Sequence, residues 1–243
     1  VSVSCSAGSP KFAPLTPKLL AAIRTLTDKP VKFVLNTHWH GDHTGGNENL
    51  GKAGALIVAH DNVRRRMSTE QFMAAMNQRV APSPKEALPV VTFTDAVTFH
   101  INGDSVVATH VAPAHTDGDA YVHFAKANVV HMGDAFNNAG FPFVDLSSGG
   151  ASQGVISAAD QVYAMTNAQT KIIPGHGPVT DRARLKQWRD AVAAVRNGVQ
   201  AAARAGRSID EVLALKLGAP YEKEWPAGHD RFVRAVFEET TRR

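Results

Sequence analysis

Three histidines and an aspartate occur within one short run of this chain, His-Trp-His-Gly-Asp-His at residues 38–43. The run follows an apolar stretch, residues 31–36, and precedes a pair of glycines, so we expect it on a loop after a strand. Zinc in catalytic sites prefers imidazole nitrogen and carboxylate oxygen, and it lowers the pKa of a bound water to about 7. The run therefore predicts a metal site. The predicted ligands are His38, His40, Asp42 and His43.

Further ligands have to be imidazoles or carboxylates, because Cys5 is the only cysteine of the chain and excludes both a thiolate cluster and an intrachain disulfide. His115 and His176 lie in loops marked by Pro or Gly next to strand-like runs, and Asp134 ends another such run. These three are candidate ligands. The remaining histidines are expected to be surface or core residues: His60, His100, His110, His123, His131 and His229.

Composition and charge narrow the class of protein. With 243 residues, of which 44% are hydrophobic and 20% charged, the chain can form a substantial core and resembles an ordinary soluble protein. No apolar run approaches the roughly 20 residues of a membrane-spanning helix. The net charge is +4, but no aromatic residues interleave with the densest basic run, residues 64–66, so a solvated helix face is favoured over a nucleic-acid partner.

The order of apolar runs and turn signals predicts mixed α/β structure. Thr16 is expected to cap a helix that begins with Pro17, and Asn102-Gly103 is the strongest hairpin signal. Ser208 and Glu211 form a predicted capping box. Helices are expected over residues 16–27, from residue 61, over 151–165, from a Thr180 cap to 205, after 208, and around 232–237. Strands are expected at residues 31–36, 55–59, 90–93, 96–101, 105–111, 121–124, 129–132 and 171–173.

The run at residues 38–43 resembles the HxHxDH signature of the metallo-β-lactamase superfamily, whose pattern also requires a later His, an Asp or Cys, and a final His. The resemblance implies an α/β fold, an αββα sandwich of two mixed β-sheets flanked by helices, as a single domain over residues 12–243. Residues 1–11 are expected to be an irregular segment, because the β-hairpin that begins family members is not recognisable there.

The resemblance also implies two zinc ions per chain. One ion would be held by His38, His40 and His115. The other would be held by Asp42, His43 and His176. Asp134 would bridge the ions, and Asp42 would also orient a shared hydroxide that attacks the substrate. Oxygen-reducing diiron relatives carry Glu in place of His40, so hydrolysis is expected here instead of redox chemistry.

The resemblance leaves more substrate classes open than metal arrangements. Asp at the bridging position occurs in thioesterases, lactonases and nucleases of the family, while the main β-lactamase subclasses carry Cys or Ser. Asn137 stands where one of those subclasses has a Lys for the β-lactam carboxylate. Trp39, Asn137 and Phe141 are the predicted substrate-binding residues, and with Phe136 and Phe143 the aromatic residues equally fit a core.

The expected function is a β-lactamase-like dinuclear zinc hydrolase that opens a small carbonyl substrate, namely a β-lactam, lactone or ester. Two alternatives stay open: a nuclease or phosphodiesterase of the same fold, and a non-catalytic metal-binding scaffold. We expect a small-molecule substrate and no membrane partner. The compartment and the oligomeric state are not fixed by the sequence. A periplasmic or secreted location is favoured, and we expect no signal peptide within these residues.

Overall fold

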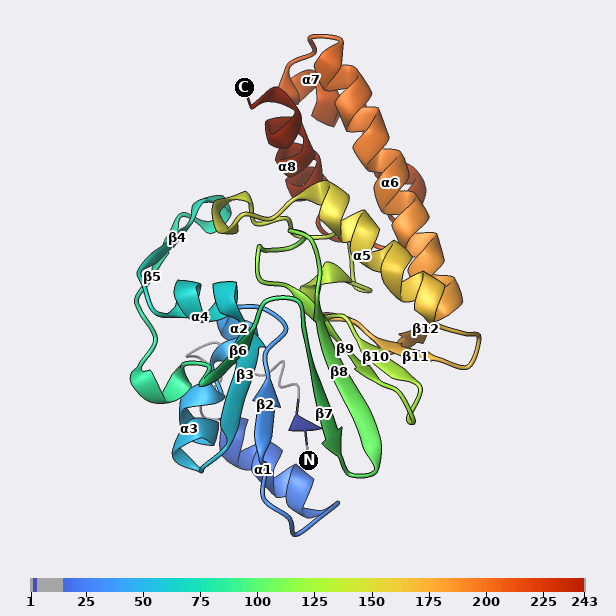
Figure 1. The fold of residues 1–243 in the computed structure, drawn as a ribbon. Helices are drawn as coiled ribbons and strands as arrows, with labels where there is room; N and C mark the ends of the chain where they lie inside the picture. Colours follow the sequence, from blue (N-terminus) through green and yellow to red (C-terminus); the bar gives the residue numbers. More distant parts are fainter. Residues whose placement is uncertain (1, 4–14, 243) are drawn as a thin grey trace. The chain divides into compact units, whose positions relative to one another are not determined.

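The computed structural model describes residues 2–3 and 15–242. The chain forms two compact units, each built from two stretches of sequence (Figure 1). Unit 1 comprises Val1–His110 and Gly118–Ala127, and unit 2 comprises Val111–Asp117 and Asn128–Arg243. The single domain expected over residues 12–243 is not tested by this division and stays a prediction.

The first sheet of unit 1 is parallel and has the strand order β1-β2-β3-β6. Its strands are β1 (Ser2–Val3), β2 (Phe33–Leu35), β3 (Leu56–His60) and β6 (Val91–Phe93). Strand β1 was not expected, because residues 1–11 carry no strand-like pattern. The rest of that N-terminal segment lies outside the described residues.

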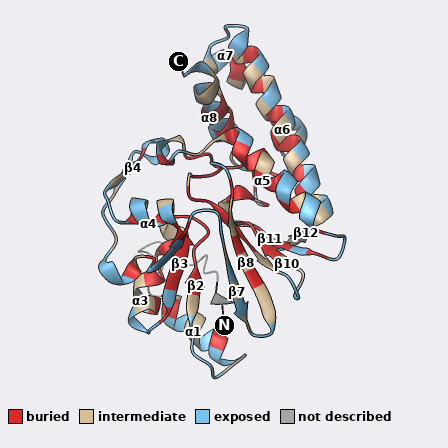
Figure 2. Ribbon diagram, in the orientation of Figure 1, coloured by how far each residue is buried: buried red, intermediate tan, exposed pale blue. Residues whose placement is uncertain are grey.

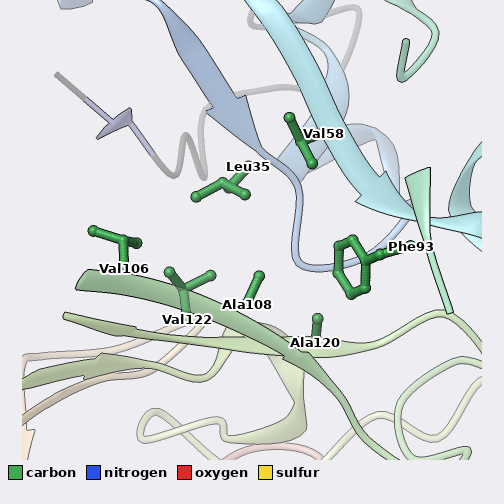
Figure 3. Close-up of a cluster of buried hydrophobic side chains, with 7 residues drawn as sticks. All are labelled: Leu35, Val58, Phe93, Val106, Ala108, Ala120 and Val122. Atoms are coloured by element: carbon green, nitrogen blue, oxygen red, sulfur yellow. The ribbon is translucent and has the colours of Figure 1, made fainter. Parts of the chain in front are cut away.

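A second set of strands in unit 1 pairs antiparallel: β7 (Ala96–Ile101), β8 (Asp104–His110) and β9 (Ala120–Phe124). The predicted hairpin between β7 and β8 is confirmed, since Asn102 and Gly103 both have the positive φ angles, 55° and 72°, of a type I′ turn. Buried apolar side chains of β2 and β3 face those of β8 and β9 (Figure 3). This cluster is the core of unit 1.

Short helices and a hairpin complete unit 1. The helices are α1 (Thr16–Arg24), α2 (Gly41–Thr44), α3 (Asn47–Lys52) and α4 (Asp61–Met67), with 3-10 turns η2 (Ala74–Met76) and η3 (Lys85–Ala87). Strands β4 (Gln71–Met73) and β5 (Gln78–Val80) pair antiparallel. The cap predicted for α1 is wrong: Leu15 is its N-cap, and Thr16 is a buried residue of the first turn.

Unit 2 combines three strands with the long C-terminal helices. Strand β10 (Val129–His131) pairs parallel with β11 (Lys171–Ile173), which pairs antiparallel with β12 (Thr180–Asp181). The helices are α5 (Ser152–Met165), α6 (Arg182–Arg204), α7 (Ile209–Ala214) and α8 (His229–Thr241), with 3-10 turns η4 (Gly133–Ala135), η5 (Leu146–Ser148) and η6 (Ala219–Tyr221). Helix α6 packs on α5 and α8.

Helix α6 buries one stripe of side chains, among them Leu185, Trp188, Val192, Val195 and Val199, at the three- and four-residue spacing of an amphipathic helix (Figure 2). Its N-cap is Asp181, which accepts the backbone N–H of Arg184 at 2.8 Å, one residue after the predicted Thr180. The capping box of Ser208 and Glu211 at the start of α7 is confirmed. Within the described residues, no helix is long and apolar enough to span a membrane.

Candidate metal centre

Residues 38–43, which carry the four predicted ligands of unit 1, are called the ligand run. The ligand run follows the end of β2 through an irregular stretch and enters α2. Its imidazoles are nearly inaccessible to solvent: His38, His40 and His43 are 1%, 4% and 3% exposed. The His38 ring lies 4.1 Å from the His43 ring and 5.0 Å from the His40 ring, centroid to centroid. Asp42 directs Oδ2 to within 3.3 Å of His43 Nε2 and is the more exposed partner, with 40% of its side chain accessible. The structure thus brings the four predicted ligands of this unit together.

A buried pair of amides holds this run in place. Asn47 Nδ2 donates to Asn36 Oδ1 at 2.8 Å, and Asn36 Nδ2 donates back to Asn47 Oδ1 at 3.1 Å. Asn47 also donates to the carbonyl of Ala87 at 3.0 Å. In α2 the Thr44 hydroxyl donates to the carbonyl of His40 at 3.1 Å. These bonds connect both ends of the run to the rest of unit 1, and no spacing in the sequence indicates them.

Unit 2 contributes the other three predicted ligands from three separate loops. Asp134 lies in η4, and its Oδ2 is 3.2 Å from His176 Nε2 and 3.7 Å from His115 Nε2. His115 is fully buried, and its Nδ1 donates to the carbonyl of Phe143 at 2.6 Å. With Nδ1 carrying the proton, the lone pair of Nε2 points toward the Asp134 carboxylate.

The approach of His176 to Asp134 depends on the glycine before it. A Cβ on Gly175 would lie 2.0 Å from Asp134 Oδ1 and 2.7 Å from the carbonyl carbon of Gly133. The backbone N–H of Gly175 donates to the carbonyls of Gly133, at 2.8 Å, and of Phe136, at 3.0 Å. Glycine is therefore needed at residue 175 to bring the two loops this close.

The predicted substrate-binding residues of unit 2 have local partners. Asn137 forms a β-bridge with His176, its Oδ1 accepts the N–H of Ala139 at 3.0 Å, and its Nδ2 donates to the carbonyl of Phe141 at 3.4 Å. Whether Asn137 contacts substrate stays a prediction. Phe141 has no exposed surface and packs against Phe232, with ring centroids 5.6 Å apart. Phe141 is therefore a core residue of unit 2, and we propose no substrate contact for it.

Trp39, the predicted substrate-binding residue of unit 1, lines a cavity of about 540 Å³. The wall also includes Gly41 of the ligand run, Met67 at the end of α4, and Pro82 and Pro84 after β5. The indole is 4% exposed and meets the His40 ring edge-on at a centroid distance of 4.8 Å. A mainly apolar recess thus adjoins the ligand run.

Arg231 is a residue near the ligands that the sequence analysis missed. It lies in the first turn of α8, and its guanidinium carbon is 4.5 Å from the centre of the Phe143 ring. Partial removal from water lowers the pKa of Arg231, and the Asp134 carboxylate raises it in part. Arginine nevertheless stays cationic at neutral pH, because a guanidinium group is not deprotonated in proteins. In the sequence it is one of several basic residues on an amphipathic helix, and no motif distinguishes it.

The donor set fits a metal ion by its chemistry. It contains only imidazole and carboxylate groups, which suit zinc. The hydrogen bond from His115 to the carbonyl of Phe143 is the kind of contact that fixes the tautomer of a ligating histidine. The Thr37 hydroxyl lies 3.1 Å from His38 Nδ1 and can fix that ring in the same way. All seven predicted ligands are among the side chains that could hold a metal ion.

Comparison with known proteins identifies the family. The sequence model of the metallo-β-lactamase superfamily matches residues 7–198. Because this match covers well over half of the chain, the protein belongs to the metallo-β-lactamase superfamily. The match ends within α6, so α7 and α8 lie beyond it.

Similar solved structures bear out the fold. A metallo-β-lactamase from Pontibacter korlensis is 22% identical with a TM-score of 0.57, over 73% of this chain and 76% of that one. A double mutant of the sec-alkyl sulfatase PisA1 is 15% identical with a TM-score of 0.70, over 99% of this chain and 45% of that one. The predicted metallo-β-lactamase fold is therefore confirmed.

Among curated proteins, a hydroxyacylglutathione hydrolase from Erythrobacter litoralis (strain HTCC2594) is 26% identical over 106 residues. The match covers 43% of this chain and 34% of the relative. The chain thus spans about a third of the length of this curated relative.

Proposed function

We propose that the protein is a metal-dependent hydrolase that opens a small carbonyl substrate, with β-lactams, lactones and esters as the candidate classes. The observation that carries the proposal is the ligand run of unit 1, where His38, His40 and His43 are buried side by side next to the half-exposed Asp42. Buried imidazoles beside one accessible carboxylate suit a metal site that keeps a position open for water. The name of one curated relative, a hydroxyacylglutathione hydrolase, is consistent with hydrolytic chemistry.

The proposed metals are two zinc ions, assigned as the family resemblance implies. His38, His40 and His115 would hold one ion. Asp42, His43 and His176 would hold the other. Asp134 would bridge them. When bound, such ions would polarise a carbonyl oxygen and would lower the pKa of a bound water to about 7.

The side chains of the protein have distinct parts in the proposed reaction. Asp42 orients the attacking water and accepts its proton, since it combines a fixed contact to His43 with an accessible carboxylate. The water oxygen forms a bond to the carbonyl carbon, and the bond to the leaving oxygen or nitrogen breaks. The proton held by Asp42 then passes to the leaving group. Asp134 Oδ2 lies 3.2 Å from His176 Nε2 and 3.7 Å from His115 Nε2, where it would share a metal ion with either imidazole.

The cavity beside Trp39 supports a substrate with an apolar part. Its volume, about 540 Å³, falls within the range of roughly 300 to 1,000 Å³ that is usual for small-molecule sites. The cavity shares Trp39 and Gly41 with the ligand run, so an apolar group held there would lie next to the proposed chemistry. We therefore favour small organic substrates over polynucleotides.

The test combines metal analysis with a hydrolysis panel of β-lactams, lactones, esters, thioesters and phosphodiesters. We expect close to two zinc ions per chain and turnover of at least one carbonyl class. His40→Ala should lose both metal and activity. His100→Ala is the matched control, because it removes an exposed imidazole outside the ligand set and should retain both. Phosphodiester turnover alone would favour the nuclease alternative, and full metal content without any turnover would favour a binding scaffold.

A further inference from the structure

His176 differs from the other predicted imidazole ligands in how its ring is held. Its side chain is 47% exposed, whereas the other four imidazoles of the predicted set are buried. Because packing does little to restrain this ring, its position depends on the conformation of the backbone that carries it, residues 175–178. Contacts that fix this loop therefore decide where the ligand lies.

One residue of the neighbouring loop binds the backbone on both sides of Gly177. The backbone N–H of Asn138 donates to the carbonyl of His176 at 2.9 Å, and Asn138 Nδ2 donates to the carbonyl of Pro178 at 2.9 Å. Gly177 has a φ of 99°, and a Cβ there would lie 2.7 Å from the backbone nitrogen of Ala139. Asn138 is buried, so both bonds form away from bulk water, where they are electrostatically stronger. We call this pair of bonds the carbonyl clamp.

Arg184, in the first turn of α6, determines which way the amide of Asn138 points. Its Nε donates to Asn138 Oδ1 at 3.2 Å. Because a guanidinium group has donors only, the amide oxygen has to face it, and the amide nitrogen is left to face Pro178. The Nη atoms of Arg184 donate to the carboxylate of Glu224 at 2.7 Å and to its carbonyl at 3.0 Å, and the guanidinium carbon lies 4.2 Å from the centre of the Trp225 ring. A line of contacts thus leads from residues 224–225 through α6 to the carbonyl clamp.

We propose that Asn138 is a positioning residue for His176: the carbonyl clamp holds the loop of this ligand in its metal-binding conformation, and Arg184 holds the clamp. The proposal rests on the proposed function, in which His176 holds one of two zinc ions, and it adds the residue that sets the affinity for that ion. A loop that is ordered before the metal arrives loses less conformational entropy on binding. The other ion of the proposed pair takes no ligand from this loop, so its affinity should not depend on the clamp.

Zinc titration against a competing chelator tests the proposal. In Asn138→Ala, which has no side-chain donor for Pro178, the affinity for one zinc ion should fall about ten- to a hundredfold, the usual effect of removing a group that orients a ligand. The affinity for the other ion should stay unchanged. Asn138→Asp keeps an acceptor for Arg184 but also lacks the donor, so it should lose the same zinc affinity while melting at a higher temperature than Asn138→Ala.

Thr170→Val is the matched control. Thr170 is buried in the same unit, and its hydroxyl donates to Asn128 Oδ1 at 2.7 Å and accepts the backbone N–H of Asn167 at 3.0 Å. The valine variant should lower Tm without changing either zinc affinity. An equal loss of zinc affinity in Asn138→Ala and Thr170→Val would overturn the proposal, because affinity would then follow general stability. Wild-type affinity for both ions in Asn138→Asp would overturn it as well, since the donor to Pro178 would then be dispensable.

Hydrogen exchange of the metal-free protein separates the carbonyl clamp from the proposed function. In excess chelator, the amides of residues 175–179 should exchange about tenfold faster in Asn138→Ala than in the wild type, and Thr170→Val should leave them unchanged. Because neither zinc nor substrate takes part, a protein that hydrolyses nothing would refute the proposed function and still show this difference. Equal exchange rates at residues 175–179 in Asn138→Ala and the wild type would overturn the clamp.

Discussion

The buried amide of Asn47 is expected to contribute strongly to the stability of the ligand run. Its side chain makes three hydrogen bonds, two with Asn36 and one with the carbonyl of Ala87, and both asparagines are at most 4% exposed. In Asn47→Ala these partners lose their bonds without gaining water. Each unsatisfied buried group costs about 1 to 3 kcal/mol. Because the losses overlap within one network, we expect a total of about 2 to 4 kcal/mol.

For a chain of this size, about 1 kcal/mol corresponds to a shift in Tm of roughly 2 to 4 °C. Asn47→Ala should therefore melt about 5 to 15 °C below the wild type. The measurement is a thermal scan of both proteins in excess chelator, so that metal binding does not contribute. Asn49→Ala is the control, since this asparagine lies on the same helix but is exposed, and its amide nitrogen lies a long 3.4 Å from Thr16 Oγ1. A Tm loss no larger than that of the control would refute the assigned role of the amide pair.

Three further predictions concern the ligands and the surface. Asp134→Ala should lower kcat by at least about a hundredfold and lose metal. Asp134→Asn should retain more metal because one oxygen remains. Wild-type metal content and kcat in the alanine variant would show that Asp134 is only a turn residue. Gly175→Ala should weaken zinc affinity by about ten- to a hundredfold, since the new Cβ would overlap Asp134. Gly54→Ala controls for backbone strain: its φ of 92° disfavours alanine, but its Cβ would meet open space, so this variant should keep wild-type affinity in the same zinc titration. Equal affinities in the two variants would contradict the predicted overlap. Backbone N–H groups, chiefly that of Lys126, donate to Asp104 and lower the pKa of its carboxyl group. The contribution of Asp104 to stability is therefore complete above about pH 4, and it is lost as the pH falls through the lowered pKa of the folded state. The difference in Tm between wild type and Asp104→Asn should accordingly shrink below pH 4, and a difference independent of pH would speak against this contribution.

The parts of the site that the sequence predicted are those that it encodes locally. The run at residues 38–43 gathers its side chains over one short stretch, so spacing alone suggested a metal site. His115, Asp134 and His176 come from distant loops, but each follows or precedes a strand-like run or a Gly- or Pro-marked turn. The assignment of these three residues to particular ions came from the family resemblance and stays a prediction.

The parts that the sequence did not predict depend on tertiary contacts. The pairing of Asn36 with Asn47 appears only when the chain folds back through α2 and α3, and two isolated asparagines have no recognisable spacing. Helix α3 was missed because glycine and asparagine disfavour helix in isolation, whereas burial of Leu50 against the sheet stabilises it in the fold. Arg231 looks like any exposed helix arginine until its position over Phe143 is known.

The two compact units alternate in the sequence, since the short stretch Val111–Asp117 of unit 2 interrupts unit 1 between β8 and β9. His115 lies within this stretch, so the chain leaves unit 1, supplies a predicted ligand to unit 2 and returns. This order constrains evolution by recombination. A single crossover that exchanges one unit for that of a relative either separates His115 from Asp134 and His176 or divides unit 1. We therefore expect the two halves of the ligand set to be inherited together, and a chimera joined at residues 127–128 to carry a His115 from the wrong parent.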